Sequence, residues 1–390
     1  MRGYFFLVFF TLLFQGCSDD SGISLPVLNV SDLKVDEGND QSILNITLEL
    51  SEAVDFKISL EAKSFDGTAT GGLDYEPFDV VVFIEPGQSN YTLEVPIYGD
   101  EVVEKDEYFE VQLIDPFNAE IATPRAIITL LNDDEQVFRI PETGVHSPDS
   151  YEGMTLVWQD EFSAARINEQ DWTFEIGTGS SGWGNNELQY YKKENASIVD
   201  GHLVIEARNE ASNGSQYTST RMITKDKQTF QYGRVDIRAV MPRGKGIWPA
   251  LWMLGNNISE VSWPACGEID IMEMIGGAET DGTTHGTIHW SNGGQHAYYG
   301  QHKSLENGVL NDEFHVYSIE WHENAITWFF DNEEFHSVDI TPAELSEFHE
   351  EFFFIFNVAV GGNWPGSPDH TTVFPQWMIV DYIRVFQSVQ

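Results

Sequence analysis

Residues 267–274 read Gly-Glu-Ile-Asp-Ile-Met-Glu-Met, which places three carboxylates inside an apolar run rich in β-formers. This composition is typical of a buried strand. Side chains alternate between the two faces of a strand, so Glu268 and Asp270 share one face. Strict alternation would turn Glu273 to the opposite face, and one extra residue would bring it back. We therefore predict a β-bulge at Ile271 and Met272.

The spacing of the two glutamates suits a particular chemistry. Four strand steps span roughly 13 Å between their Cα atoms, and inward-leaning side chains leave the carboxyl groups roughly 5–6 Å apart. That separation is typical of a retaining glycosidase, in which one carboxylate attacks the sugar and the other protonates the leaving oxygen. Asp270 between them would help to separate their pKa values. Because the chain holds 63 Asp and Glu, a calcium site or a solvated edge strand stays open as an alternative.

A second stretch just upstream, residues 246–254, reads Gly-Ile-Trp-Pro-Ala-Leu-Trp-Met-Leu. Together the two stretches resemble glycoside hydrolase family 16, and more narrowly its bacterial laminarinase-type β-1,3-glucanases, over about residues 156–386. The resemblance implies a concanavalin-like jelly roll whose concave sheet forms a substrate cleft. It also implies that Glu268 is the nucleophile, Glu273 the acid/base and Asp270 their helper.

The same resemblance indicates which residues hold the sugar. The residues that match substrate contacts of the family are Asn185, Arg221, Trp248, Trp252, Trp263 and His289. Aromatic rings suit this task because sugars present apolar CH faces, although core packing would explain any single tryptophan equally well. The alternative for Arg221 is an ordinary ion pair. His289 is expected to support the carboxylates rather than to act as acid or base.

The first third of the chain has a different character. Residues 27–131 form short alternating runs separated by turn residues, which predicts an all-β sandwich. The acidic motifs Val-Asp-Glu-Gly at 35–38 and Asn-Asp-Asp-Glu at 132–135 resemble an immunoglobulin-like Calx-β domain. The predicted divisions are a signal peptide at 1–16, a tether at 17–25, a Calx-β-like domain at 26–135, a linker at 136–150 and a catalytic domain at 151–390.

Both resemblances imply structural calcium, whereas catalysis needs no cofactor. The positions that match calcium ligands in the Calx-β-like domain are Glu37, Asp74, Asp100, Asp133 and Asp134. In the catalytic domain they are Glu161, Gly201 and Asp381. Carboxylate and carbonyl oxygens are the ligands that Ca²⁺ prefers. The alternative for the first domain is a spacer whose acidic loops are simply solvated.

The N-terminus predicts export. Residues 1–16 are Met-Arg followed by an apolar run that is too short to span a bilayer, which is typical of a signal peptide. Cys17 resembles the lipid-acceptor cysteine of bacterial lipoproteins, and the acidic segment Ser18-Asp19-Asp20 resembles signals for the cell-surface side of an outer membrane. The alternative is an ordinary cleaved signal and a secreted protein. Only Cys266 would remain as a second cysteine, so no internal disulfide is expected.

The net charge of −43 excludes nucleic acids and anionic membrane surfaces as partners and favours a neutral polysaccharide. We expect a monomeric, retaining endo-hydrolase of β-1,3-glucan (laminarin), with mixed-linkage β-1,3-1,4-glucan as a further substrate. The alternatives are an agarase-like galactan hydrolase, a non-catalytic glycan-binding surface lipoprotein, and an adhesion or spacing protein that works through its first domain.

Overall fold

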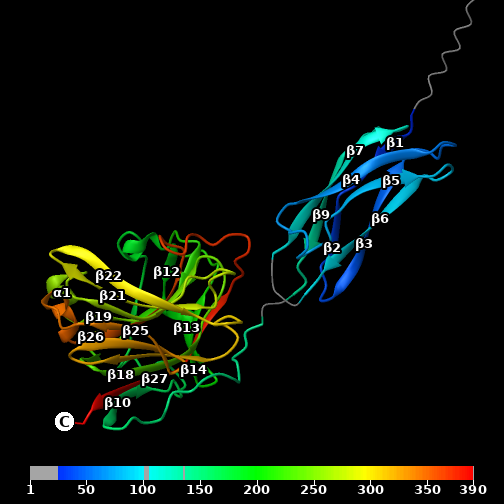
Figure 1. Ribbon diagram of the computed structural model, residues 1–390. Helices are drawn as coiled ribbons and strands as arrows, with labels where there is room; N and C mark the ends of the chain where they lie inside the picture. The colour runs from blue at the N-terminus through cyan, green and yellow to red at the C-terminus, as the bar shows by residue number, and fades with distance from the viewer. Residues whose placement is uncertain (1–24, 101–104, 135–136, 390) are drawn as a thin grey trace, which may run out of the picture. The chain divides into compact units, whose positions relative to one another are not determined.

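The computed structural model describes residues 25–100, 105–134 and 137–389 and divides the chain into two compact units, which change over at Asp133 and Asp134 (Figure 1). The predicted signal peptide and Cys17 lie outside the described residues. Within the described part of the chain, no helix has the length and apolar character needed to cross a membrane. Each unit is built almost entirely of strands, as predicted.

The first unit is a sandwich of a four-stranded sheet, in the order β6-β3-β1-β8, and a five-stranded sheet, β2-β9-β7-β4-β5. Strand β3 shows why the sheets stack: Leu44, Ile46 and Leu48 are buried while the residues between them are exposed. The strands are β1 (Val27–Asn29), β2 (Leu33–Asp36), β3 (Gln41–Leu50), β4 (Ile58–Asp66), β5 (Asp79–Ile84), β6 (Asn90–Tyr98), β7 (Glu107–Phe117), β8 (Glu120–Ile121) and β9 (Arg125–Leu131).

The second unit packs two eight-stranded sheets around one core. Its strands are β10 (Met154–Asp160), β11 (Thr173–Glu175), β12 (Gln189–Tyr191), β13 (Ala196–Val199), β14 (His202–Ala207), β15 (Tyr217–Ser219), β16 (Arg221–Ile223), β17 (Thr229–Phe230), β18 (Gly233–Val240), β19 (Ile247–Gly255), β20 (Glu268–Glu273), β21 (Thr283–Asn292), β22 (Gln295–Ser304), β23 (His315–Trp321), β24 (Ala325–Phe330), β25 (Glu333–Asp339), β26 (Phe352–Val360) and β27 (Gln376–Ser388). Helical turns are short: α1 (Ile258–Val261), η1 (Gly182–Asn186), η2 (Lys193–Asn195) and η3 (Ala343–His349).

The two eight-stranded sheets of this unit differ in strand order, and one of them carries the acidic strand. One follows the path β13-β14-β27-β18-β23-β24-β25, with β10 added to β27. The other follows β11-β16-β26-β19-β20-β21-β22, with β17 added to β26, and Figure 1 shows it as the second layer. Strand β26 is buried along its whole length, as expected for a central strand. The acidic strand β20 lies in this second sheet, between β19 and β21.

The predicted bulge in β20 is confirmed. Asp270 pairs with Thr287 and Glu273 with His285, so Ile271 and Met272 together face the single residue between them on β21. That residue is Gly286, where any side chain would collide with the ring of Trp328. The Trp328 indole in turn donates a 2.8 Å hydrogen bond to the carbonyl of Asp270. The kinked backbone is therefore held from the core side.

A tight hairpin between β24 and β25 also matches its sequence prediction. Asp331 and Asn332 form the two-residue turn, with φ of 51° and 67°. These positive values belong to turns that fit the twist of the two strands, and Asn and Asp tolerate them well.

Residues 137–150, predicted as a linker, lie against the second unit. The ring of Phe138 packs edge-on against Trp377, with centroids 5.3 Å apart. The Val145 carbonyl accepts a 2.6 Å hydrogen bond from Arg238 Nε, and Gly144 forms a β-bridge with Phe314. The proline and glycine content of this segment indicated a connection, but its apolar side chains give it a packed surface.

Candidate active site

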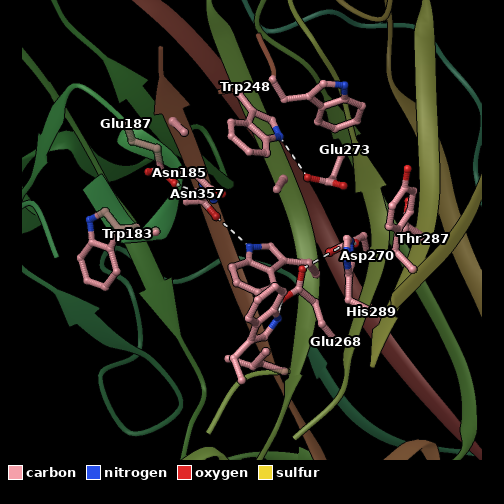
Figure 2. Close-up of a pocket in the computed structure, with 18 of the residues that line it drawn as sticks. Trp183, Asn185, Glu187, Trp248, Glu268, Asp270, Glu273, Thr287, His289 and Asn357 are labelled. Carbon is pink, nitrogen blue, oxygen red and sulfur yellow. Dashed lines mark hydrogen bonds and ion pairs between the residues drawn. The ribbon is translucent and has the colours of Figure 1, made fainter. Parts of the chain in front are cut away.

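A cleft of about 620 Å³ lies over the sheet that contains β20. Glu268, Asp270 and Glu273 all line it, because the bulge returns the last of them to the side of the other two (Figure 2). The intervening Ile269 and Ile271 point into the core. One short strand therefore carries three carboxylates into the cleft.

Two tryptophans hold the glutamates. Trp248 Nε1 donates a 3.0 Å hydrogen bond to Glu273 Oε1, and Trp263 Nε1 donates a 2.9 Å bond to Glu268 Oε2. Trp364 packs edge-on against Trp248, with ring centroids 5.7 Å apart. An indole N–H can only donate, so each bond fixes one oxygen of the carboxyl group and leaves the other available.

Asp270 and His289 lie beside the nucleophile candidate Glu268. His289 is the cross-strand partner of Glu268, and its Nε2 lies 3.2 Å from Asp270 Oδ2 and 3.8 Å from Glu268 Oε1. The side chain of Asp270 is 2% exposed, the least of the three carboxylates. This arrangement makes His289 the group that faces both carboxylates from the neighbouring strand.

Burial raises the pKa of all three carboxyl groups above their ordinary values. The charge of Asp270 adds to this effect on the pKa of Glu268 and of Glu273, while the neighbouring His289 opposes it. Carboxyl groups that keep a proton near neutral pH can serve as general acids. The cluster can therefore hold one protonated and one ionised glutamate, which is what double displacement requires.

A chain of hydrogen bonds supports the opposite side of the cleft, where Figure 2 shows Asn185, Glu187 and Asn357. Trp252 Nε1 donates to Asn357 Oδ1 at 2.8 Å, and Asn357 Nδ2 donates to the Tyr191 hydroxyl at 3.1 Å. That hydroxyl donates in turn to Glu187 Oε2 at 3.1 Å. Asn185 Nδ2 reaches the other oxygen of Glu187 at 3.4 Å. A partly buried carboxylate thus anchors, through these bonds, the indole of Trp252, a predicted sugar contact.

Asn357→Ala is expected to raise KM about fivefold and to leave kcat within about twofold, since the Trp252 indole loses its acceptor but remains in place. Steady-state kinetics on a soluble glucan would measure this effect. A fall in kcat at unchanged KM would instead assign Asn357 to the reacting centre.

Arg221 forms the ion pair that its alternative interpretation predicted, and it also lines the cleft. Its guanidinium lies over the rings of Trp183 and Trp252, 4.6 and 4.9 Å from their centroids. Its Nε also forms a 2.6 Å ion pair with Glu175. The ion pair fixes the guanidinium between two aromatic faces, a stable arrangement at the wall of a sugar-binding cleft.

All nine residues predicted for catalysis and substrate binding line this single cleft. Sequence reasoning did not single out Glu187, Asn357, His296 and Tyr298, which line it as well. Glu187 lies two residues after Asn185, so an acidic residue this close to a predicted sugar contact was a usable signal. The others come from strands whose neighbours a single sequence does not reveal. The roles of all these residues stay predictions.

Arginines contact both carboxylates of the calcium position predicted in this unit. Arg384 forms a bidentate pair with Glu161, with bonds of 2.7 and 2.9 Å, and Arg238 contacts Asp381 at 2.7 Å. Gly201 forms the turn before β14, with φ of 78°. Calcium at this position stays a prediction.

In the first unit, the calcium candidates make backbone contacts. Asp133 Oδ1 accepts a 2.9 Å hydrogen bond from the Gly38 amide, and Asp74 Oδ2 accepts one from Thr70 at 2.6 Å. Among the residues that the structure describes, one group of three acidic or histidine side chains brings ligand atoms within 4.8 Å of one another, namely Glu268, Asp270 and His289. That group lies in the cleft, so calcium binding by Glu37, Asp100 and Asp134 also stays a prediction.

A jelly-roll sandwich with two glutamates facing one cleft is the arrangement of a glycoside hydrolase. The family model of glycosyl hydrolases family 16 matches residues 183–383, and the chain belongs to this family. A Calx-beta domain model matches residues 19–135. The all-β fold and both family resemblances are therefore confirmed.

Three relatives illustrate the similarity. The beta-glucanase of Rhodothermus marinus is 39% identical over 60% of this chain and 86% of its own length. The clotting factor G alpha subunit of Tachypleus tridentatus is 40% identical over 60% of this chain, which spans only 34% of that relative. The laminarinase catalytic domain of Thermotoga maritima is 47% identical, with a TM-score of 0.56 over 61% of this chain and 100% of that domain.

Proposed function

We propose that this protein cleaves internal β-1,3 bonds of glucans such as laminarin, with retention of the anomeric configuration. The observation that carries the proposal is the bulge of β20, which brings Glu268 and Glu273 to the same side of the sheet and into one cleft. Similarity to the laminarinase catalytic domain of Thermotoga maritima supports the choice of substrate.

The geometry supports a division of labour between the two glutamates. Glu268, ionised and fixed by Trp263, attacks the anomeric carbon, and Glu273, protonated and fixed by Trp248, gives its proton to the leaving oxygen. Glu273 then removes a proton from water, which releases the sugar from Glu268. His289 and Asp270 lie beside Glu268 and compensate for its charge. When Glu268 attacks the sugar and loses that charge, the electrostatic field at both neighbours changes.

Product sizing on laminarin, lichenan and agarose tests this proposal. We expect a ladder of oligosaccharides from laminarin, slower release from lichenan, because mixed-linkage glucan shares part of the same backbone, and none from agarose. Proton NMR during the first minutes should show the β-anomer of the new reducing end. Cleavage of agarose alone, or binding of laminarin without turnover, would contradict the proposal.

We further propose that the first unit binds Ca²⁺ through its acidic loops, which include Asp74 and Asp133. Isothermal titration of the full chain with calcium, compared with an Asp133→Asn variant, tests this. Equal heats in both proteins, or no heat at millimolar calcium, would count against it. Laminarin turnover measured in calcium and in chelator shows whether any bound ion affects the catalytic unit.

Anchoring through Cys17 at the outer face of the cell is a separate proposal, and it rests on the apolar run and the small residue that precede this cysteine. Radiolabelled palmitate should enter the full-length protein in cells and should not enter a Cys17→Ala variant. Equal labelling of both proteins would remove the anchor.

A further inference from the structure

Two histidines from adjacent strands meet at the nucleophile end of the cleft. His289 lies on β21 and His296 on β22, the edge strand of the sheet. His289 Nδ1 and His296 Nε2 are 2.9 Å apart, a hydrogen-bond distance, and the two rings lie nearly parallel. The other nitrogen of His289 is the one that faces Asp270 and Glu268.

His296 also contacts Trp263, the tryptophan that holds the nucleophile candidate Glu268. Its ring centroid is 4.6 Å from that of Trp263, whose N–H is donated to Glu268. A continuous network of contacts therefore runs from Glu268 through Trp263, His296 and His289 to Asp270. In this network, His296 is the residue contributed by β22.

We infer that His296 is a positioning residue that fixes the tautomer of His289 and thereby directs the Nε2–H of His289 at the catalytic carboxylates. Only one proton can lie between the two facing nitrogens. If His296 Nε2 supplies it, Nδ1 of His289 accepts that hydrogen bond and His289 carries its own proton on Nε2. That nitrogen then donates toward a cluster that carries negative charge on Glu268, the favourable orientation.

The alternative tautomer would place a lone pair of His289 against the carboxylates. That arrangement brings hydrogen-bond acceptors face to face in a buried site, which is unfavourable. Burial lowers the pKa of His296, so His296 is neutral at neutral pH and its one N–H is available to donate. The inference rests on the proposed glucanase activity only for its kinetic readout.

Three variants separate a hydrogen-bonding role from a packing role. His296→Phe keeps a ring against Trp263 but removes the donor, and His296→Gln keeps a donor N–H. The matched control is His302→Phe, because His302 is also exposed on β22 but its ring faces His285 at 5.7 Å.

On laminarin, His296→Phe should lower kcat about 3- to 10-fold with KM within about twofold, the effect of one lost hydrogen bond. His296→Gln should restore kcat to within about twofold of the wild type, and His302→Phe should match the wild type. A raised KM at unchanged kcat would make His296 a sugar contact and overturn the inference. Equal losses in the Phe and Gln variants would overturn it as well.

An independent readout needs no turnover. Carbon-13 NMR of ring-labelled histidine reports the tautomer of His289, which should be the Nε2–H form in the wild type and in His296→Gln and a mixture in His296→Phe. A wild-type His289 in the Nδ1–H form would overturn the inference. An inactive wild type with the Nε2–H form would contradict the proposed function and leave the positioning role supported.

Discussion

Glu268→Gln and Glu273→Gln are each expected to lower the rate of laminarin hydrolysis by about three orders of magnitude or more. Glutamine keeps the size of the side chain and an oxygen that accepts from Trp263 or Trp248, but it can neither attack nor transfer a proton. Circular dichroism and thermal unfolding should show an unchanged fold. Full activity in either variant would remove its assigned role.

The two roles can be told apart with azide and an activated aryl glycoside as substrate. In Glu268→Ala, azide can take the place of the missing nucleophile and should give the α-glycosyl azide by a single inversion. In Glu273→Ala, azide attacks the sugar attached to Glu268 and should give the β-glycosyl azide. If the two variants gave the opposite products, the roles of Glu268 and Glu273 would be exchanged. The control variant His302→Phe, which keeps both glutamates, should give neither glycosyl azide.

The catalytic strand was predictable because its signal is local. The spacing of Glu268, Asp270 and Glu273 conflicts with a strict two-residue period, and a bulge is the smallest change that removes the conflict. Trp263, five residues before Glu268, was close enough in sequence to be associated with it. The physical cause, three carboxylates that need one common face outside the apolar core, is present within eight residues.

The far wall of the cleft was less accessible to sequence reasoning because it depends on strand order. The order β16-β26-β19-β20-β21-β22 places Asn357 beside Trp252 and His296 beside His289. Alternation within a strand predicts which way Asn357 points, but it does not predict which strand lies next to it. Long-range pairing therefore determined the residues that sequence reasoning missed.

The calcium position in the catalytic unit shows a different limit. Family resemblance matched Glu161 and Asp381 by position, yet charge pairing depends on which cations lie across the sheet. Arg384 and Arg238 approach these carboxylates from β27 and β18. A bidentate arginine satisfies a carboxylate as fully as a metal ion can. Whether these carboxylates pair with arginine or with calcium therefore depends on the folded surface and not on the sequence positions alone.

Asp270→Asn is expected to move the alkaline limb of the pH profile of kcat/KM toward lower pH. Burial raises the pKa of Glu268 and Glu273, and the charge of Asp270 raises both further. Asp270 holds its own proton at acid pH, so its charge is present only toward alkaline pH, and asparagine removes it there. Glu273 must be protonated for attack, so the alkaline limb, which reports the loss of its proton, shifts to lower pH, and the acid limb stays near its wild-type position. Initial rates on laminarin from pH 4 to pH 9 would measure both limbs, and an unmoved profile would show that Asp270 carries no charge in the free enzyme.

The same variant should also be more stable at alkaline pH. Burial raises the pKa of Asp270 to about 8 from an ordinary value of 3.8. The folded state therefore holds this proton more tightly than the unfolded chain does, so the group favours folding at acid pH and its contribution is lost as the pH rises from about 4 through about 8. Asparagine has no proton to lose and no charge to bury, so we expect the free energy of unfolding at pH 8 to rise by roughly 1–3 kcal/mol, with little change at pH 4. Urea unfolding at the two pH values measures this difference, and equal stability of the two proteins at pH 8 would mean that Asp270 is ionised without penalty. A side chain that lowers stability is retained when the chemistry of the site requires it. A gain in stability together with a displaced pH profile in Asp270→Asn would therefore identify Asp270 as a group kept for catalysis.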